Sequence, residues 1–192
     1  MESLVTIVGA GALGSHLVQF ARNWQVKLRV VDFDRVEPKN LAAQFHAKQS
    51  YRKNKAQALA SAMQFLWGTS LEAIPHRLTS ENAKVVLGQS NLVIDCTDNF
   101  EARNLIQQTC ILHGIPCLHG CLSADGLFAR MIWTENFVPD HEGQPGQATC
   151  EEGDRVAFYA LVGAHLALTA KDFLDFGRKV NKQLTSTSVL IL

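Results

Sequence analysis

The stretch LVTIVGAGALG, residues 4–14, joins an apolar, β-branched run to three spaced glycines. An apolar run that breaks into glycines in this way predicts a strand, a tight turn and a helix. Gly9 and Gly11 have no side chains, so the backbone can bend there and a ligand can come close, while Gly14 lets the helix pack against the sheet. The helix N-terminus offers free N–H groups and a positive dipole end. The stretch therefore predicts a phosphate-binding turn.

A second strand and an acidic residue strengthen this interpretation. The run at residues 26–31, Val-Lys-Leu-Arg-Val-Val, predicts the next strand and leads into Asp32. An acid at the end of the second strand can accept hydrogen bonds from ribose hydroxyls. The alternative is a helix entry that tolerates glycine and binds nothing, and the order of strand, glycines, helix and acid disfavours it. These parts alone would suit a dinucleotide such as NAD.

The rest of the chain alternates between strand and helix patterns. This predicts an α/β fold, namely a Rossmann-like, doubly wound, mainly parallel sheet with helices on both faces. The short turn between the runs at 116–119 and 126–132 predicts an antiparallel extension near the C-terminus. Strands are expected at 71–74, 92–95 and 188–192, helices at 53–65, 81–87, 100–112 and 154–176, and a long loop at 134–153.

Bulk composition limits the classes of function. A length of 192 residues predicts one domain, residues 1–192. The chain has 18 basic and 18 acidic residues, so no charge excess points to nucleic acid or to a membrane surface as a partner. No basic region precedes the first apolar run, and the run at 156–170 is short for a membrane span. We expect a cytoplasmic protein whose five cysteines do not form a disulfide framework.

Polar residues follow the predicted strands at the edge where the glycine turn also opens. Asp34 and Asn40 lie in a polar segment after the second strand, and Asp98 follows the strand at 92–95. One residue of the pair Asp98 and Asn99 could simply cap the next helix. The stretch from Asp95 to Asn99 nevertheless brings two acids and an amide to this edge, which fits a hard cation that accompanies phosphates. Lys55 lies in a first helical turn, where a cation is unfavourable, so it either extends into solvent or binds an anion.

Taken together, these motifs resemble the ubiquitin-activating-type adenylating enzymes, the superfamily of ThiF, MoeB and HesA. The resemblance runs from Val5 to about Lys171. It rests on six segments in order: the glycine turn at 9–14, Val31 to Asp34 with Val36-Glu37, Asn40-Leu41 with Gln44, Lys55, Asp95 to Asn99 with Arg103, and Thr149 to Glu151.

The resemblance implies an activity and a set of site residues. It implies ATP- and Mg²⁺-dependent adenylation of the C-terminal carboxylate of a ubiquitin-like or sulfur-carrier protein with a Gly-Gly-type end, by a homodimer or heteromer. Asp98 would bind Mg²⁺, and Cys150 occupies the place of a cysteine that takes the acyl group or sulfur in some relatives. The residues that would hold ATP are Gly9, Gly11, Gly14, Asp32, Asp34, Asn40, Gln44 and Lys55.

One departure from the family pattern keeps other functions open. Ala43 stands where the family carries a phosphate-contacting arginine, and Arg35, Arg52 or a partner subunit could substitute for it. The chain could instead be a catalytically weak scaffold or heteromer subunit. A third alternative is an NAD-dependent oxidoreductase, which Lys55, Asp98 and Asn40 disfavour because a dinucleotide needs no triphosphate clamp.

Overall fold

A computed structural model describes residues 3–139 and 153–192. Its strands are β1 (Leu4–Val8), β2 (Lys27–Val31), β3 (Glu72–Ile74), β4 (Leu92–Asp95), β5 (Cys117–Leu122), β6 (Phe128–Trp133), β7 (Lys182–Thr185) and β8 (Val189–Ile191). Its α-helices are α1 (Ala12–Ala21), α2 (Lys55–Trp67), α3 (Ala83–Leu87), α4 (Phe100–His113) and α5 (Val156–Phe176).

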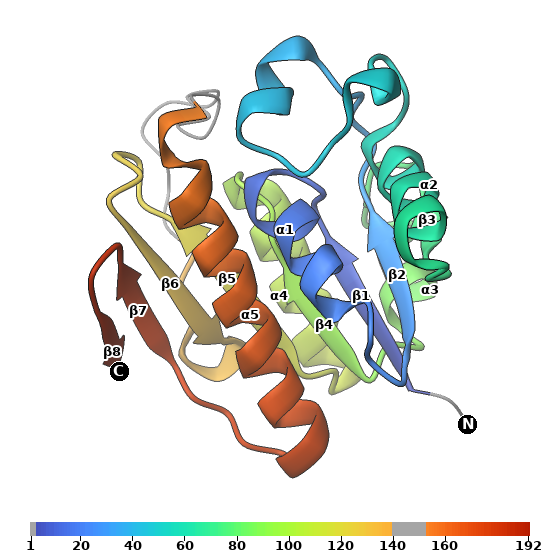
Figure 1. Cartoon of the computed structure of the whole chain (residues 1–192). Coiled ribbons are helices and arrows are strands. Elements are labelled where there is room, and N and C mark those ends of the chain that lie inside the picture. Colours follow the sequence, from blue (N-terminus) through green and yellow to red (C-terminus); the bar gives the residue numbers. More distant parts are fainter. Residues whose placement is uncertain (1–2, 140–152) are drawn as a thin grey trace.

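All eight described strands form one sheet, in the order β3-β2-β1-β4-β5-β6-β7-β8 (Figure 1). The strands β3, β2, β1, β4 and β5 are parallel, and β6, β7 and β8 continue the sheet in antiparallel fashion. The order reverses between β1 and β4, so the carboxyl ends of β1, β2 and β4 adjoin at the switch point where α/β folds bind ligands. The predicted fold class is confirmed, while a single domain over the whole chain stays a prediction.

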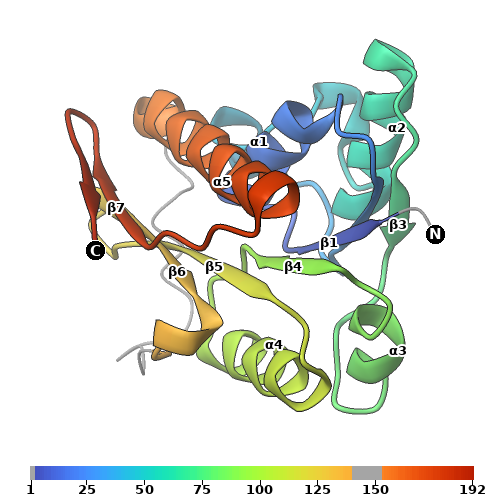
Figure 2. The ribbon, with the colours of Figure 1, turned by 90° about the horizontal axis from the view of Figure 1, so that it is seen from below.

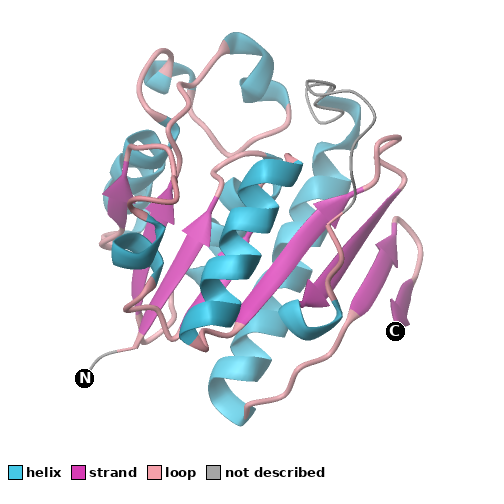
Figure 3. Cartoon of the chain, turned by 180° about the vertical axis from the view of Figure 1, so that it is seen from behind, coloured by secondary structure: helices cyan, strands magenta, loops and turns pink. Residues whose placement is uncertain are grey.

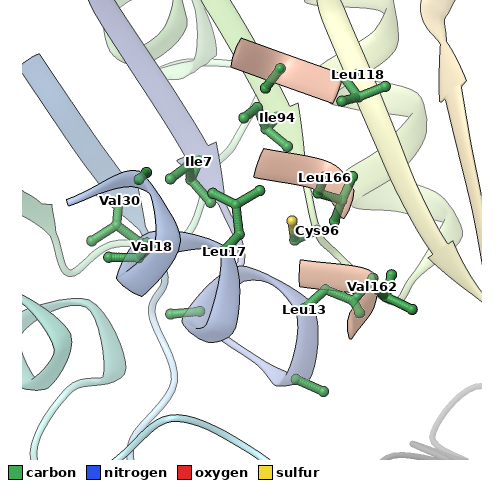
Figure 4. Packing of buried hydrophobic residues seen from close by; sticks show 14 of the residues in the cluster. Ile7, Leu13, Leu17, Val18, Val30, Ile94, Cys96, Leu118, Val162 and Leu166 are labelled. Atoms are coloured by element: carbon green, nitrogen blue, oxygen red, sulfur yellow. The ribbon is translucent and has the colours of Figure 1, made fainter. Parts of the chain in front are cut away.

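Helices cover both faces of the sheet. Figure 2 shows α1, α2 and α5 on one face and α3 and α4 on the other, and Figure 3 shows α4 lying across the second face. The larger core lies between the sheet and the helices α1, α2 and α5. In it, Leu13 and Leu17 of α1 pack near Val162 and Leu166 of α5 (Figure 4). The smaller core lies between the sheet and α3 with α4. The parallel strands are buried on both faces, which explains their nearly continuous apolar runs.

Three details differ from the sequence-based expectations. The strand β7 was not predicted, because its residues, Lys-Gln-Leu-Thr, carry no apolar alternation that would announce it. The expected loop at 134–153 begins with a 3₁₀ turn, Thr134–Asn136, and residues 140–152 lie outside the described part of the chain. The last long helix begins at Val156, after a 3₁₀ turn at Gly153–Arg155.

Candidate functional site

The three glycines of the first turn have different structural roles. Gly9 has a positive φ of 96°, and a Cβ there would lie 2.7 Å from the Cys96 carbonyl oxygen. A Cβ on Gly14 would lie 1.9 Å from the Gly9 carbonyl oxygen. Gly11 caps the start of α1, and the nearest atom to a Cβ there is Gln44 Nε2, at 4.0 Å. Gly9 and Gly14 therefore allow close packing, whereas Gly11 faces open space in which a ligand could approach the backbone.

Asp32 ties the end of β2 to the glycine turn. Its Oδ2 accepts a hydrogen bond from the Ala10 N–H at 2.7 Å, and its Oδ1 accepts one from the Asp34 N–H at 2.8 Å. Burial raises the pKa of Asp32, and the nearby Lys55 ammonium partly opposes that rise. Each carboxylate oxygen keeps a second lone pair, so the carboxylate can still accept bonds from a ligand's hydroxyl groups.

Lys55 does not extend into solvent. Its side chain is only 10% exposed, and its Nζ lies 3.3 Å from Oδ2 of Asp34, which is 51% exposed. The preceding residue, Asn54, caps α2 by accepting from the Gln57 N–H and donates through its NH₂ to the Asp32 carbonyl oxygen. The start of α2 is thereby fastened to the segment after β2. A nearly buried ammonium is thus held beside the carboxylates of Asp34 and Asp32, and Asp32 in turn is hydrogen-bonded to the glycine turn.

The buried amides Asn40 and Gln44 lie on the segment that crosses this edge. The Asn40 Oδ1 accepts the Glu37 N–H at 2.9 Å, and the Glu37 side chain accepts the Asn40 N–H in return. This capping box leaves the Asn40 NH₂ as the part of the side chain that could donate to a ligand. The Gln44 Oε1 is buried without a hydrogen-bond partner among the described residues. Such an atom is costly to bury, so it marks Gln44 as a position that a ligand could satisfy.

His46 is a member of the site that the sequence analysis did not identify. Its Nε2 donates to the Ala10 carbonyl oxygen, with the two atoms 2.9 Å apart, and its Nδ1 is buried without a partner among the described residues. The pKa of His46 is lowered to about 4, chiefly by burial and to a smaller extent by the nearby Lys55 and His16, while the bond to the Ala10 carbonyl oxygen opposes the lowering. The only signal was a polar residue two positions after Gln44, which is too weak to single out one histidine of seven.

Asp98 lies in the loop that leaves β4 toward α4. Asp95 pairs with Val8 in register, and a Cβ on Gly9 would be 3.2 Å from the Thr97 nitrogen, so this loop runs beside the glycine turn. Asn99, not Asp98, caps α4, accepting from the Ala102 N–H at 2.9 Å. Asp98 is exposed, with no hydrogen bond or ion pair to the described part of the chain. Its carboxylate is therefore available to a cation at the edge of the sheet.

Several sequence-based assignments concern thiols. Cys150 lies outside the described residues. Among the described residues, Cys96, Cys110 and Cys117 are buried free thiols, and Cys121 is a partly buried free thiol. Burial raises the pKa of Cys96 and of Cys117, so neither thiol is poised as a nucleophile.

Position 43, where the resemblance implies an arginine, lies within the packed core. Ala43 is fully buried in the larger core, and its carbonyl oxygen accepts from His16 Nε2 at 3.2 Å. An arginine side chain at position 43 would have no space in this packing and no access to solvent. Of the candidate substitutes, Arg35 donates to the Arg52 carbonyl oxygen at 2.7 Å. Both arginines lie on the exposed segment after β2, away from the core.

Comparison with known proteins gives a consistent result. The model of the ThiF family matches residues 1–191. The chain is 35% identical over 125 residues to the SAMP-activating enzyme E1 of Haloferax volcanii, covering 64% of this chain and 46% of that protein. It is 37% identical over 121 residues to the sulfur carrier protein adenylyltransferase of Thermus thermophilus, covering 62% and 45%. The adenylyltransferase and sulfurtransferase MOCS3 of Caenorhabditis briggsae is 35% identical over 200 residues, covering 98% and 49%. The chain thus spans about half the length of these relatives.

Solved structures show the same fold. A crystal structure of E. coli MccB superposes with a TM-score of 0.78 at 15% identity, covering 99% of this chain and 61% of that one. A structure of the microcin C7 biosynthetic enzyme MccB in complex with N-formylated MccA gives a TM-score of 0.79 at 14% identity, covering 99% and 63%. Within residues 3–139 and 153–192, no helix has the length and hydropathy that crossing a membrane requires.

Proposed function

Because this chain belongs to the ThiF family, we propose that it adenylates the C-terminal carboxylate of a small ubiquitin-like or sulfur-carrier protein, using ATP and Mg²⁺. The names of its relatives, a SAMP-activating enzyme and a sulfur carrier protein adenylyltransferase, support this class of substrate. The family match over residues 1–191 supports assigning the adenylating part of such an enzyme to this chain.

The environment of Lys55 is the observation that carries the proposal. Its ammonium is nearly buried between the glycine turn and the segment after β2, and its partner Asp34 is half exposed. A buried cation beside free helix N–H groups is suited to a ligand with several negative charges. A triphosphate can replace Asp34 as the partner of Lys55, whereas a nicotinamide dinucleotide carries fewer charges to offer. This environment favours ATP over NAD.

The other site residues take complementary roles. Gly9, Gly11 and Gly14 shape the turn whose N–H groups receive the phosphates, and Asp32 accepts from the ribose hydroxyls. The NH₂ of Asn40 donates to the triphosphate, and the Gln44 amide gains a partner for its orphaned Oε1. Asp34 orients Lys55 before the nucleotide arrives.

Asp98 is suited to act as a ligand of Mg²⁺. Mg²⁺ prefers carboxylate oxygen and keeps several waters, so one exposed carboxylate beside a phosphate-binding turn is a sufficient protein contribution. The ion, when bound, neutralises charge on the triphosphate and so reduces its repulsion of the substrate carboxylate. The protein's own part is to hold Asp98 where such an ion accompanies the phosphates.

The proposed reaction forms one bond and breaks one. A carboxylate oxygen of the partner protein bonds to the α-phosphorus of ATP, and the bond from that phosphorus to the bridging β-phosphate oxygen breaks. The products are an acyl-adenylate and pyrophosphate, with the electron pair leaving on pyrophosphate. Lys55 and the turn N–H groups stabilise the charge that moves, and the site holds the two anionic reactants together. Cys150 stays a predicted acyl or sulfur acceptor, with no step assigned to it.

A second candidate is a scaffold or heteromer subunit that binds nucleotide or partner without turnover. The closed packing at Ala43 favours it, because the site then lacks one phosphate-contacting cation. Either function is compatible with a homodimer or heteromer in the cytoplasm, and neither calls for nucleic acid or membrane.

Pyrophosphate exchange into ATP separates the candidates. The probe is a synthetic peptide ending in Gly-Gly with a free carboxylate, and the control is the same peptide ending in an amide. We expect exchange that depends on the free carboxylate and on Mg²⁺. ATP binding without exchange would support the scaffold, and NAD binding without ATP binding would support the oxidoreductase.

A further inference from the structure

A buried chain of hydrogen-bonded side chains joins the end of β4 to β5 and to Thr134, next to the loop that carries Asp98. Asp95, the last residue of β4, is 1% exposed at its side chain, and His119 of β5 is 0% exposed. The two residues are register partners in the parallel pair β4–β5, and Asp95 Oδ2 lies 2.8 Å from His119 Nδ1. His119 Nε2 lies 2.8 Å from Thr134 Oγ1. An ionised carboxylate can only accept, so the Nδ1–H of His119 donates to Asp95.

The second oxygen of Asp95 holds the loop that follows β4. Asp95 Oδ1 accepts from the Thr97 N–H at 2.9 Å and from the Thr97 hydroxyl at 2.7 Å. On the other side, the Arg103 guanidinium donates twice to the Thr97 carbonyl oxygen, at 3.1 and 2.9 Å. The N–H, the carbonyl and the side chain of Thr97 are therefore all fixed. The next residue along the chain is Asp98.

The ring of His119 is itself held tightly. It stacks on Phe137 with ring centroids 3.8 Å apart and planes 8° apart. The Phe137 carbonyl oxygen accepts from Gln107 Nε2 of α4 at 2.8 Å. This arrangement leaves His119 one orientation, in which Nδ1 points at Asp95. Side chains with fixed second partners are the usual way in which proteins orient a ligating loop.

We propose that His119 is a positioning residue of the nucleotide site: through Asp95 it fixes Thr97 and so sets where Asp98 presents its carboxylate. The catalytic part of this inference rests on the proposed function, since Asp98 has a role only if a metal-bound nucleotide binds. The structural part is independent of it, because it concerns the order of the loop at residues 97–98 in the free protein.

Three variants of His119 separate positioning from packing. His119→Asn places an amide NH₂ where Nδ1 stood and keeps the donor to Asp95. His119→Gln places its NH₂ near the position of Nε2, toward Thr134, and His119→Phe removes both polar contacts. All three lose the imidazole itself, so Asn and Gln share a similar loss of ring stacking. A purely structural role would make the Asn and Gln variants equally impaired.

The first readout is hydrogen exchange of the Thr97 amide in the free protein. We expect exchange to accelerate about tenfold or more in the Phe and Gln variants, relative to the Val93 amide within β4, and to stay near the wild-type rate in the Asn variant. The second readout is the Mg²⁺ concentration that gives half-maximal pyrophosphate exchange. It should rise about tenfold in the Phe and Gln variants and less in Asn, while KM for ATP at saturating Mg²⁺ changes little.

The rates of Thr97 amide exchange decide between positioning and packing. Equal Thr97 exchange in all four proteins would overturn the inference, whatever their activity. Equal acceleration in the Asn and Gln variants would also overturn it, because packing alone would then explain the effect. Faster Thr97 exchange in the Phe and Gln variants, combined with a wild type that binds no ATP, would overturn the proposed function and support only the ordering of the loop.

Discussion

The carboxyl edge of the parallel sheet has two halves that differ in how their polar groups are satisfied. The open half, beside β1 and β2, contains Gly11, Asp32, Gln44, His46 and Lys55, and two of its buried polar atoms have no partner among the described residues. The closed half, beside β4 and β5, contains Asp95, Thr97, Arg103, His119 and Thr134, which are joined by hydrogen bonds of 2.7–3.1 Å.

The difference indicates that the two halves of the sheet edge have different roles: the open half is suited to binding a ligand, and the closed half holds the backbone in place. A buried polar atom without a partner costs free energy, so the Gln44 Oε1 and the His46 Nδ1 mark positions where a ligand or a water molecule would be stabilising. A saturated network gains nothing from a ligand and instead holds the backbone in one place. We therefore expect substitutions in the open half to change binding and activity, and substitutions in the closed half to change stability first.

Replacing Lys55 should give the largest effect. Lys55→Met keeps the apolar stem and removes the charge, so pyrophosphate exchange should fall about 10²–10³-fold. The free energy of unfolding should change by less than about 1 kcal/mol, since the partner Asp34 is half exposed. Lys53→Met is the matched control, because Lys53 is exposed and two residues away. Equal activity of the two variants would show that the open half does not bind the triphosphate through Lys55.

Asp95 and Asp98 lie three residues apart and should behave oppositely. Asp95→Ala leaves the Thr97 hydroxyl and N–H and the His119 Nδ1–H without their acceptor, so we expect a loss of about 2–4 kcal/mol in the free energy of unfolding. Asp98→Ala removes an exposed carboxylate and should cost less than about 0.5 kcal/mol while reducing exchange activity. Chemical denaturation measures the first quantity. A stable Asp95→Ala variant would contradict the assignment of a closed half.

His46 should make stability depend on pH. Its pKa falls from 6.5 to about 4 on folding, so between these values the unfolded chain binds more protons than the folded chain. Its contribution is therefore complete above pH 6.5 and is lost as pH falls toward 4, by up to about 3 kcal/mol. Asp32, whose pKa is raised, acts with the opposite sign.

The comparison that isolates His46 is with His46→Gln, whose NH₂ can keep the bond to the Ala10 carbonyl oxygen. Unfolding free energies measured from pH 7 to pH 4.5 should fall more steeply in the wild type than in this variant. Parallel curves for the two proteins would mean that the imidazole is not buried beside Lys55.

Restoring an arginine at position 43 should give a smaller effect, and in the unfavourable direction. Ala43 lies in the core, so Ala43→Arg overpacks it and should cost roughly 1–3 kcal/mol of stability without raising exchange activity. Ala43→Ser, which adds one small polar group, is the control for disturbing the site. A faster Ala43→Arg variant of unchanged stability would show that position 43 belongs to the open half.

Part of the open half could be predicted from the sequence, because the glycine turn and Asp32 stand directly after strands, and the fold class came from the same strand and helix patterns. Lys55 was singled out by its place in the first turn of a predicted helix, whereas His46 had no adequate sequence signal. The burial of Lys55 could not be predicted, because it depends on Asn54 fastening α2 to the segment after β2. The strand β7 was not predicted because a short, mostly polar strand has little hydrophobic pattern of its own.

The closed half could not be predicted because its contacts connect residues far apart in the chain. Asp95 and His119 are 24 positions apart and meet only through the register of β4 with β5. A usable signal existed, since each is a polar residue in or at the end of an apolar strand, and adjacent parallel strands bring such positions together. Without the strand order, however, nothing indicates which polar positions are neighbours.

Calorimetric titration of the protein with ATP in the presence of Mg²⁺, alongside the same titration with NAD, tests whether the open half is a triphosphate site. We expect the wild type to bind ATP and not NAD, Lys55→Met to weaken ATP binding about tenfold or more, and Lys53→Met to leave it unchanged. Binding of NAD without ATP, or ATP binding that is indifferent to Lys55, would contradict this assignment.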